Sequence, residues 1–190
     1  MTELPVRVAV LVSGGGTNLQ ALLESLRESP VARIARVISN RPDAPALQRA
    51  QRANIPTTVL RDPADANELL AALGDAHLVV LAGYLKLVPG AVVSRFRGRM
   101  INIHPALLPE FGGPGMYGHR VHEAVLASGA RESGATIHFV DEQFDRGAII
   151  AQERVPIEPG DTPDSLAARV LEAEHRLLPR VVLDLARRMS

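Results

Sequence analysis

The sequence predicts an α/β protein with a Rossmann-like, doubly wound and mostly parallel sheet. Three short apolar runs rich in β-branched residues are nearly continuous, as in parallel strands covered on both faces. They are Val6–Val12, Ile34–Ser39 and Leu78–Gly83. Segments with helical spacing separate them, at residues 18–29, 45–54 and 64–73. Alternation of strand and helix is typical of doubly wound sheets.

The remaining elements follow in order. A short strand is expected at residues 57–60, between the second and third helical segments. A helix over Lys86–Phe96, with Pro89 near its start, should lead into a strand at 99–104. After a loop rich in glycine and proline at 105–118, we expect a helix at 119–128, strands at 135–140 and 148–155, and a final helix from Asp164 to Met189.

Length and composition limit the class of protein. The chain has 190 residues, enough for one domain, residues 1–190, with a substantial core. Lys+Arg and Asp+Glu are both 21, so no basic surplus suggests a nucleic-acid partner. No apolar run approaches the length of a membrane span, and the first residues, Met1–Pro5, lack the design of a signal peptide. The absence of cysteine fits a reducing cytoplasm, so we expect a cytoplasmic protein. We also expect a monomer or homodimer that binds small molecules and no metal.

A glycine-rich loop, Ser13–Asn18, follows the first strand and opens the first helix. Glycines there let the backbone approach a ligand, and a helix N-terminus offers free N–H groups to a phosphate. The loop is not a Walker motif, and Leu19 replaces the third glycine of a dinucleotide fingerprint. It therefore favours a single phosphomonoester, although a merely tight turn stays open.

Asn102 and His104 lie two residues apart on a predicted strand, so both side chains point to one face. The strand ends at Pro105, which places that face at the carboxyl-end crevice of the sheet. Structural and catalytic roles both stay open for this pair. Asp145 in the turn at 141–147 can pair with His104 and raise its pKa.

The other histidines and acidic residues have simpler interpretations. His119-x-x-His122 has helical metal-ligand spacing, but without further ligands a surface helix is favoured. His138 within a strand is expected to be structural. By residue type alone, Glu174 in the final helix and Asp141 in the turn would be solvated.

Taken together, the chain resembles the glycinamide ribonucleotide formyltransferases. The segments that carry the resemblance are VLVSGGGTNLQAL, VISNRPDA, VVLAGYLKLV, INIHPALLP, GATIHFVDEQFDRGAIIAQ and ARVLEAEH. The resemblance implies a formyltransferase fold and transfer of a formyl group from 10-formyltetrahydrofolate to the amine of 5-phosphoribosylglycinamide. It also implies a phosphate-binding half, residues 1–100, and a catalytic and folate-binding half, residues 101–190.

The same resemblance assigns the site residues. The catalytic trio is Asn102, His104 and Asp145. Residues that match substrate contacts are Gly16, Thr17, Asn18 and Glu174. Residues that match the border of the folate pocket are Leu85, Lys86, Leu87, Val88, Asn102, Val140 and Asp141. Asn102 and a protonated His104 would donate hydrogen bonds to the oxyanion formed when the amine attacks the formyl carbon.

Three other functions compete with this interpretation. Formyltetrahydrofolate deformylase is a hydrolase with a related domain, but it normally carries an N-terminal regulatory domain that we do not expect here. Methionyl-tRNA formyltransferase needs an RNA-binding domain. A non-catalytic nucleotide-binding module would have no reason to keep Asn102, His104 and Asp145 together.

Overall fold

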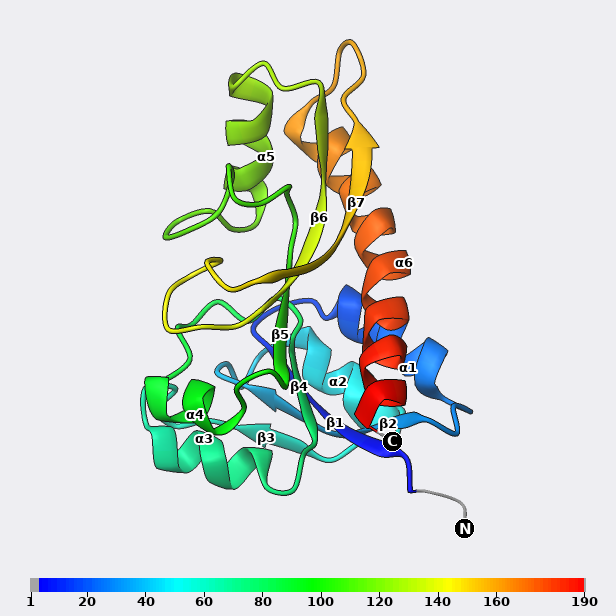
Figure 1. Ribbon diagram of the computed structural model, residues 1–190, viewed down its shortest axis with the longest axis vertical. Helices are drawn as coiled ribbons and strands as arrows, with labels where there is room; N and C mark the ends of the chain where they lie inside the picture. The colour runs from blue at the N-terminus through cyan, green and yellow to red at the C-terminus, as the bar shows by residue number, and fades with distance from the viewer. Residues whose placement is uncertain (1–3, 190) are drawn as a thin grey trace.

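The computed structural model describes residues 4–189 and shows, in that part of the chain, one seven-stranded sheet with helices on both faces (Figure 1). The strands are β1 Val6–Val12, β2 Ala32–Ser39, β3 Thr57–Val59, β4 Leu78–Leu81, β5 Met100–His104, β6 Glu132–Phe139 and β7 Ile149–Pro156. The helices are α1 Thr17–Leu26, α2 Pro45–Arg52, α3 Ala66–Leu73, α4 Gly90–Arg95, α5 His119–Ala127 and α6 Pro163–Met189. Met1–Glu3, which contributed to the expected localisation, lie outside the described residues.

Every predicted strand and helix is present, and one boundary is clearly wrong. The helix expected from Lys86 begins only at Gly90, with Pro89 in the N-cap position. A residue that precedes proline is disfavoured in the helical region, so Val88 cannot continue a helix into Pro89. Residues 85–88 therefore stay outside the helix and are free to border a cleft.

The strand order is β3-β2-β1-β4-β5-β6-β7. The first five strands in sequence pair in parallel, whereas β5–β6 and β6–β7 pair antiparallel. The chain leaves β1 toward β2 on one side and returns to β4 on the other, so the order reverses next to β1. In open α/β sheets, ligands bind at the carboxyl ends of the strands beside such a reversal. The predicted mostly parallel, doubly wound fold is confirmed.

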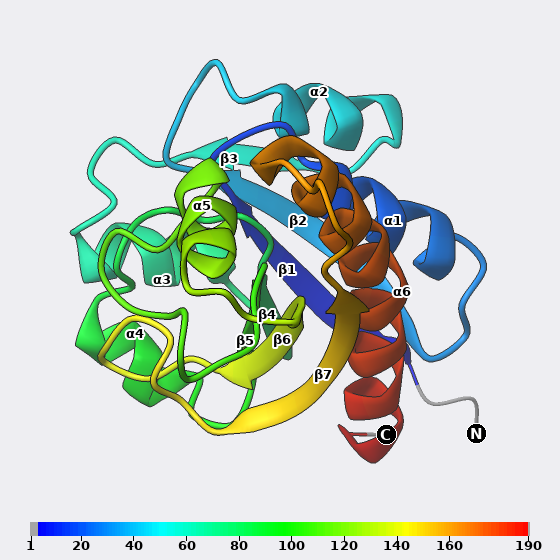
Figure 2. The same ribbon diagram turned by 90° about the horizontal axis from the view of Figure 1, so that it is seen from above.

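Two hydrophobic cores lie on the two faces of the sheet. Val8 and Val10 of β1 belong to the core beneath α1, α2 and α6, and Ala9 and Leu11 to the core beneath α3 and α4. Figure 2 shows these two groups of helices on opposite sides of the strands. The continuous apolar strands of the sequence follow directly, because both faces of the central strands are buried.

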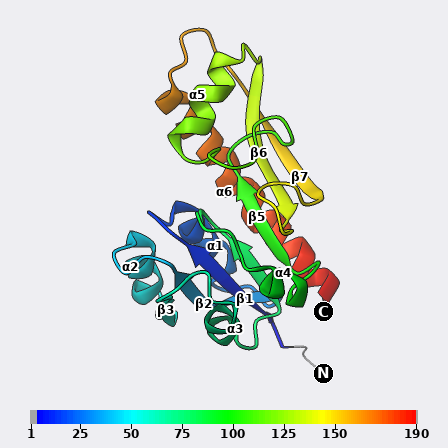
Figure 3. The ribbon, with the colours of Figure 1, turned by 90° about the vertical axis from the view of Figure 1, so that its left-hand side faces the viewer.

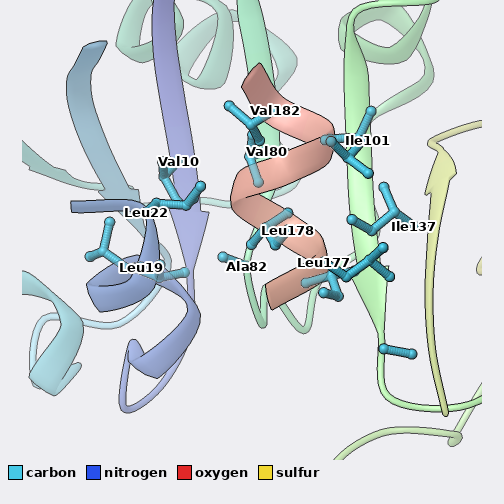
Figure 4. Packing of buried hydrophobic residues seen from close by; sticks show 14 of the residues in the cluster. Val10, Leu19, Leu22, Val80, Ala82, Ile101, Ile137, Leu177, Leu178 and Val182 are labelled. Carbon is cyan, nitrogen blue, oxygen red and sulfur yellow. The ribbon is translucent and has the colours of Figure 1, made fainter. Parts of the chain in front are cut away.

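Helix α6 contacts elements that are far apart in the sequence, namely α1 as well as β6 and β7. Its buried side chains Leu177, Leu178 and Val182 pack between residues of the central strands and α1 (Figure 4). The start of β1 and the end of α6 lie near each other at one end of the molecule (Figures 1 and 3). In residues 4–189, no helix combines the length and apolar character needed to cross a membrane.

Candidate active site

A cleft of about 460 Å³ opens at the carboxyl ends of β4 and β5. This volume lies in the range of small-molecule sites. The lining includes the predicted residues Asn18, Leu85, Lys86, Leu87, Val88, Asn102, His104, Val140, Asp141, Asp145 and Glu174. Two predicted substrate-binding residues, Gly16 and Thr17, do not line it. The structure thus brings nearly all of the expected residues together at one site.

Strand β5 delivers Asn102 and His104 to the cleft. Its residues Ile101 and Ile103 point into the core beneath α6, so the alternate residues Asn102 and His104 point the other way. His104 is 3% exposed, yet it borders the cleft. The period-two spacing that the sequence showed is therefore the reason why both polar side chains reach the same place.

Asp145 lies at the centre of a cluster of polar side chains that includes Asn102, His104 and His138. Its carboxylate accepts hydrogen bonds from the Gly113 N–H at 3.0 Å and from Asn102 Nδ2 at 3.3 Å. Asp145 Oδ2 lies 3.5 Å from His104 Nδ1, and Oδ1 lies 3.4 Å from His138 Nε2. The predicted approach of Asp145 to His104 is confirmed at ion-pair distance.

His138 is a member of this cluster that sequence reasoning assigned to the framework. It lies opposite Asn102 in the antiparallel pairing of β5 with β6. Its Nδ1 lies 2.8 Å from the Phe139 carbonyl, which can only accept, so Nδ1 carries a proton. Its Nε2 lies 3.0 Å from Asn102 Nδ2 and 3.4 Å from Asp145 Oδ1. Only the register between two strands, which one sequence does not reveal, would have pointed to His138.

His104 has acceptors on both ring nitrogens. Nε2 donates to the Phe111 carbonyl at 2.7 Å, and Nδ1 faces Asp145. Burial lowers the pKa of His104 from 6.5, and this effect exceeds the opposing influence of Asp145 and the Phe111 carbonyl. Asp145 raises the pKa of His104 as expected, but the net shift is downward because the ring is almost completely buried.

The pKa of Asp145 is shifted in the direction that keeps it ionised. Burial raises the pKa, but contact with His138, the charge of His104 and the Gly113 N–H together bring it below its usual 3.8. The backbone of Asp145 has φ 56°, a left-handed conformation that a non-glycine residue rarely adopts. The strained backbone and the ionised side chain are both held by contacts with β5, β6 and the loop at 105–118.

The glycine-rich loop packs tightly against α2 at Gly16. Gly16 has φ 74°, and a Cβ there would lie 2.5 Å from Ala46 Cβ on α2. The first helical N–H groups of α1 have no helical partners, as at every helix start. The loop thus requires glycine at position 16 both for its conformation and for the close approach of α2.

Glu174 contradicts the expectation from residue type that it would be solvated. It is 6% exposed, and its Oε2 accepts a hydrogen bond from Asn18 Nδ2 at 3.3 Å. Burial raises the pKa of Glu174 to about 7. This pair connects α6 to the glycine-rich loop, and both residues border the cleft, as the family resemblance implied.

The two histidines of α5 differ from each other. His119 is exposed and contacts Glu123 and Asp164, as expected for a surface helix. His122 is 5% exposed and lines the cleft, so the same expectation is wrong for it. Its Nδ1 has no hydrogen-bond partner in the protein. In residues 4–189, no three His, Asp or Glu side chains are grouped closely enough to hold a metal ion.

Comparison with known proteins decides the family. Residues 6–182 match the formyl transferase family. The chain belongs to this family. A phosphoribosylglycinamide formyltransferase, chloroplastic, of Arabidopsis thaliana is 45% identical over 93% of this chain and 64% of its own length. A crystal structure of phosphoribosylglycinamide formyltransferase from Anaplasma phagocytophilum is 39% identical, with a TM-score of 0.89 over 96% of this chain and 87% of that one.

The similarity to formyl transferases extends to larger proteins. A trifunctional purine biosynthetic protein adenosine-3 of Gallus gallus is 42% identical over 92% of this chain, which spans only 18% of that protein. The chain thus spans less than two thirds of the length of these curated relatives. The resemblance to glycinamide ribonucleotide formyltransferases that the sequence predicted is confirmed, and so is the formyltransferase type of fold.

Proposed function

We propose that the protein transfers the formyl group of 10-formyltetrahydrofolate to the amine of 5-phosphoribosylglycinamide, a step of purine biosynthesis. One observation carries the proposal. A single cleft joins the Asn102–His104–Asp145 cluster to the Asn18–Glu174 pair beside the glycine-rich loop. A phosphorylated, ribose-containing amine bound at the second group would present its reactive end to the first.

The folate co-substrate would occupy the apolar part of the cleft. Leu85 and Leu87 are about half exposed, and Tyr117 and Phe144 also expose large apolar surfaces there. Exposed apolar side chains gathered around one cleft favour a flat, largely apolar ligand. Small-molecule ligands and a cytoplasmic location also agree with the balanced charge and the absence of cysteine.

Attack of a neutral amine on the formyl carbon forms a tetrahedral intermediate with a negative oxygen. The intermediate collapses when the bond between the formyl carbon and N10 of the folate breaks, and the proton lost by the attacking amine is taken up by N10. His104 would donate to this oxygen from Nε2, the atom that donates to the Phe111 carbonyl in the structure. The Phe111 carbonyl thus marks where such an acceptor can lie, and it must move aside for the formyl oxygen. Asn102 Nδ2 is likewise engaged by His138 and Asp145, so its donation to the oxyanion requires a small rotation of the amide.

Asp145 would favour the protonated form of His104 as the oxyanion forms. Burial disfavours the imidazolium, and the carboxylate 3.5 Å from Nδ1 offsets part of that effect. As the transition state develops negative charge next to Nε2, the imidazolium gains a second anionic neighbour. The site therefore stabilises charge that exists only near the transition state.

The test follows loss of the formyl group from 10-formyltetrahydrofolate with and without phosphoribosylglycinamide. If the protein is a transferase, the formyl group should be lost only when phosphoribosylglycinamide is present. Equal loss without the amine would indicate a hydrolase, and no loss would indicate a binding module.

We expect His104→Ala to fold normally and to lose about 10²–10³ in kcat, as when one oxyanion donor is removed. His77→Ala, at a histidine that precedes the amino end of β4 and does not line the cleft, is the control. Turnover of His104→Ala close to that of wild type would contradict the assigned role.

A further inference from the structure

Arg49 on α2 contacts the glycine-rich loop but does not line the cleft. Its Nε donates to the Gly15 carbonyl at 2.8 Å, and its Nη1 donates to Gln20 Oε1 on α1 at 3.3 Å. The same helix also holds the preceding peptide, because the Ala46 N–H donates to the Gly14 carbonyl at 3.1 Å. Two consecutive carbonyls of the loop thus point toward α2.

The direction of these carbonyls fixes the direction of the amides that follow them. In a trans peptide, the C=O of one residue and the N–H of the next point in opposite directions. The N–H groups of Gly15 and Gly16 therefore face away from α2. In the described part of the chain, neither of these N–H groups has a hydrogen-bond acceptor. Successive free amides at a helix start form a concave site for an anion.

We infer that Arg49 is a positioning residue that orients the Gly15 and Gly16 amides for the phosphate of the substrate. The inference rests on the proposed function, since it assigns the phosphate to this loop. The planar guanidinium suits the task because its fork reaches two acceptors on different segments at once, the Gly15 carbonyl and the Gln20 side chain. Arg49 thereby ties the loop and α1 to α2 without touching the ligand.

Arg49 packs against the glycine-rich loop, whereas Arg52 on the same helix does not contact the loop carbonyls. A Cβ placed on Gly16 would lie 3.4 Å from Arg49 Cδ and 2.5 Å from Ala46 Cβ, so the stem of Arg49 runs directly behind the loop. Arg52, one turn further along α2, lines the same surface groove but is exposed and contacts no loop carbonyl. The two arginines share helix, charge and groove, and they differ in the contact with Gly15.

The kinetic test compares Arg49→Ala, Arg49→Lys and Arg52→Ala. We expect Arg49→Ala to raise KM for phosphoribosylglycinamide by roughly tenfold, the effect of one well-placed hydrogen bond. Its kcat and its KM for 10-formyltetrahydrofolate should stay within about twofold of wild type. Arg49→Lys should recover part of the KM, and Arg52→Ala should match wild type. Equal behaviour of Arg49→Ala and Arg52→Ala, or an equal rise in both KM values, would overturn the inference.

A binding test separates failure of the inference from failure of the proposed function. Inorganic phosphate is titrated into the full chain while the amide signals of Gly15 and Gly16 are followed by NMR. Wild type and Arg52→Ala should bind alike, and Arg49→Ala should bind roughly tenfold more weakly. Phosphate binding by wild type with no formyl transfer would sink the proposed function alone. Unchanged phosphate affinity in Arg49→Ala, or no phosphate response at these amides in wild type, would sink the inference.

Discussion

Asp145 in the cleft has both a strained backbone conformation and an ionised side chain held by charged and polar neighbours. Its left-handed backbone costs on the order of 1 kcal/mol or more for a non-glycine residue. Contacts with Gly113, Asn102 and two histidines hold it in place. Asparagine tolerates this conformation as well as aspartate does, so Asp145→Asn removes the charge and leaves the backbone intact.

For Asp145→Asn we expect a lower rate and a shifted pH profile. The carboxylate raises the pKa of His104 against the effect of burial, so its loss lowers that pKa further. If protonated His104 is the active form, the fall in rate with rising pH moves to lower pH. Initial rates measured from pH 5 to 9 check the shift, with Glu142→Gln on the same turn as the control. Coincident profiles of Asp145→Asn and wild type would exclude this electrostatic role.

Glycine has different importance at neighbouring positions of the loop. Gly16→Ala places a Cβ against Ala46 and forces alanine into φ 74°, so we expect a loss of stability of about 1–3 kcal/mol. A Cβ at Gly14 meets nothing within 4 Å and its φ is ordinary, so Gly14→Ala should change stability by less than about 0.5 kcal/mol. Urea unfolding measures both. Similar midpoints for the two variants would contradict the packing argument.

In strands β5 to β7, the sequence predicts where each strand lies but not how the strands pair. Apolar runs and helical spacing locate every strand and helix, because these periodicities reflect which faces are buried. They do not reveal pairing register, so the contact of His138 with Asn102 and Asp145 could not be predicted. The family motifs found the buried Glu174, which residue type alone would have placed in solvent.

Helix α6 should contribute strongly to stability, since its apolar face covers the sheet from the central strands to β6 and β7 (Figure 4). Leu177 is fully buried there, near Ile101 and Ile137. We expect Leu177→Ala to destabilise the protein by about 2–5 kcal/mol, as for other buried leucines. Arg180→Ala, at an exposed position of the same helix, should cost less than about 0.5 kcal/mol. Chemical denaturation of both variants decides whether α6 is packed as described.

Across the whole molecule, stability depends on pH through groups with opposite tendencies. The pKa values of His104 and His122 are lowered by burial, so the folded state binds fewer protons than the unfolded state below pH 6.5. These histidines make the protein less stable as pH falls. The raised pKa of Glu174 acts in the other direction, because between pH 4.5 and about 7 the folded state keeps a proton that the unfolded state loses.

Glu174→Gln should separate these two tendencies. Ionisation of the buried Glu174 carboxyl destabilises the folded protein. This destabilisation is absent near pH 4.5 and grows as the pH rises through about 7. The variant should therefore be more stable than wild type at pH 8 by a few kcal/mol, at about 1.4 kcal/mol per unit of pKa shift, and similar near pH 4.5. Thermal or urea unfolding at both pH values tests this, with the exposed Glu172→Gln as control. An equal difference at the two pH values would show that Glu174 is not the titrating group.

The closeness of the beginning of β1 to the end of α6 has a consequence for the connectivity of the fold. The beginning of β1 and the end of α6 lie near each other, and β1 runs from there toward the carboxyl-end edge where the cleft opens (Figures 1 and 3). A polypeptide joined to either end would leave from the amino-end edge of β1, away from the cleft. A short linker joining the beginning of β1 to the end of α6 would therefore create a circular permutant with the cleft unchanged.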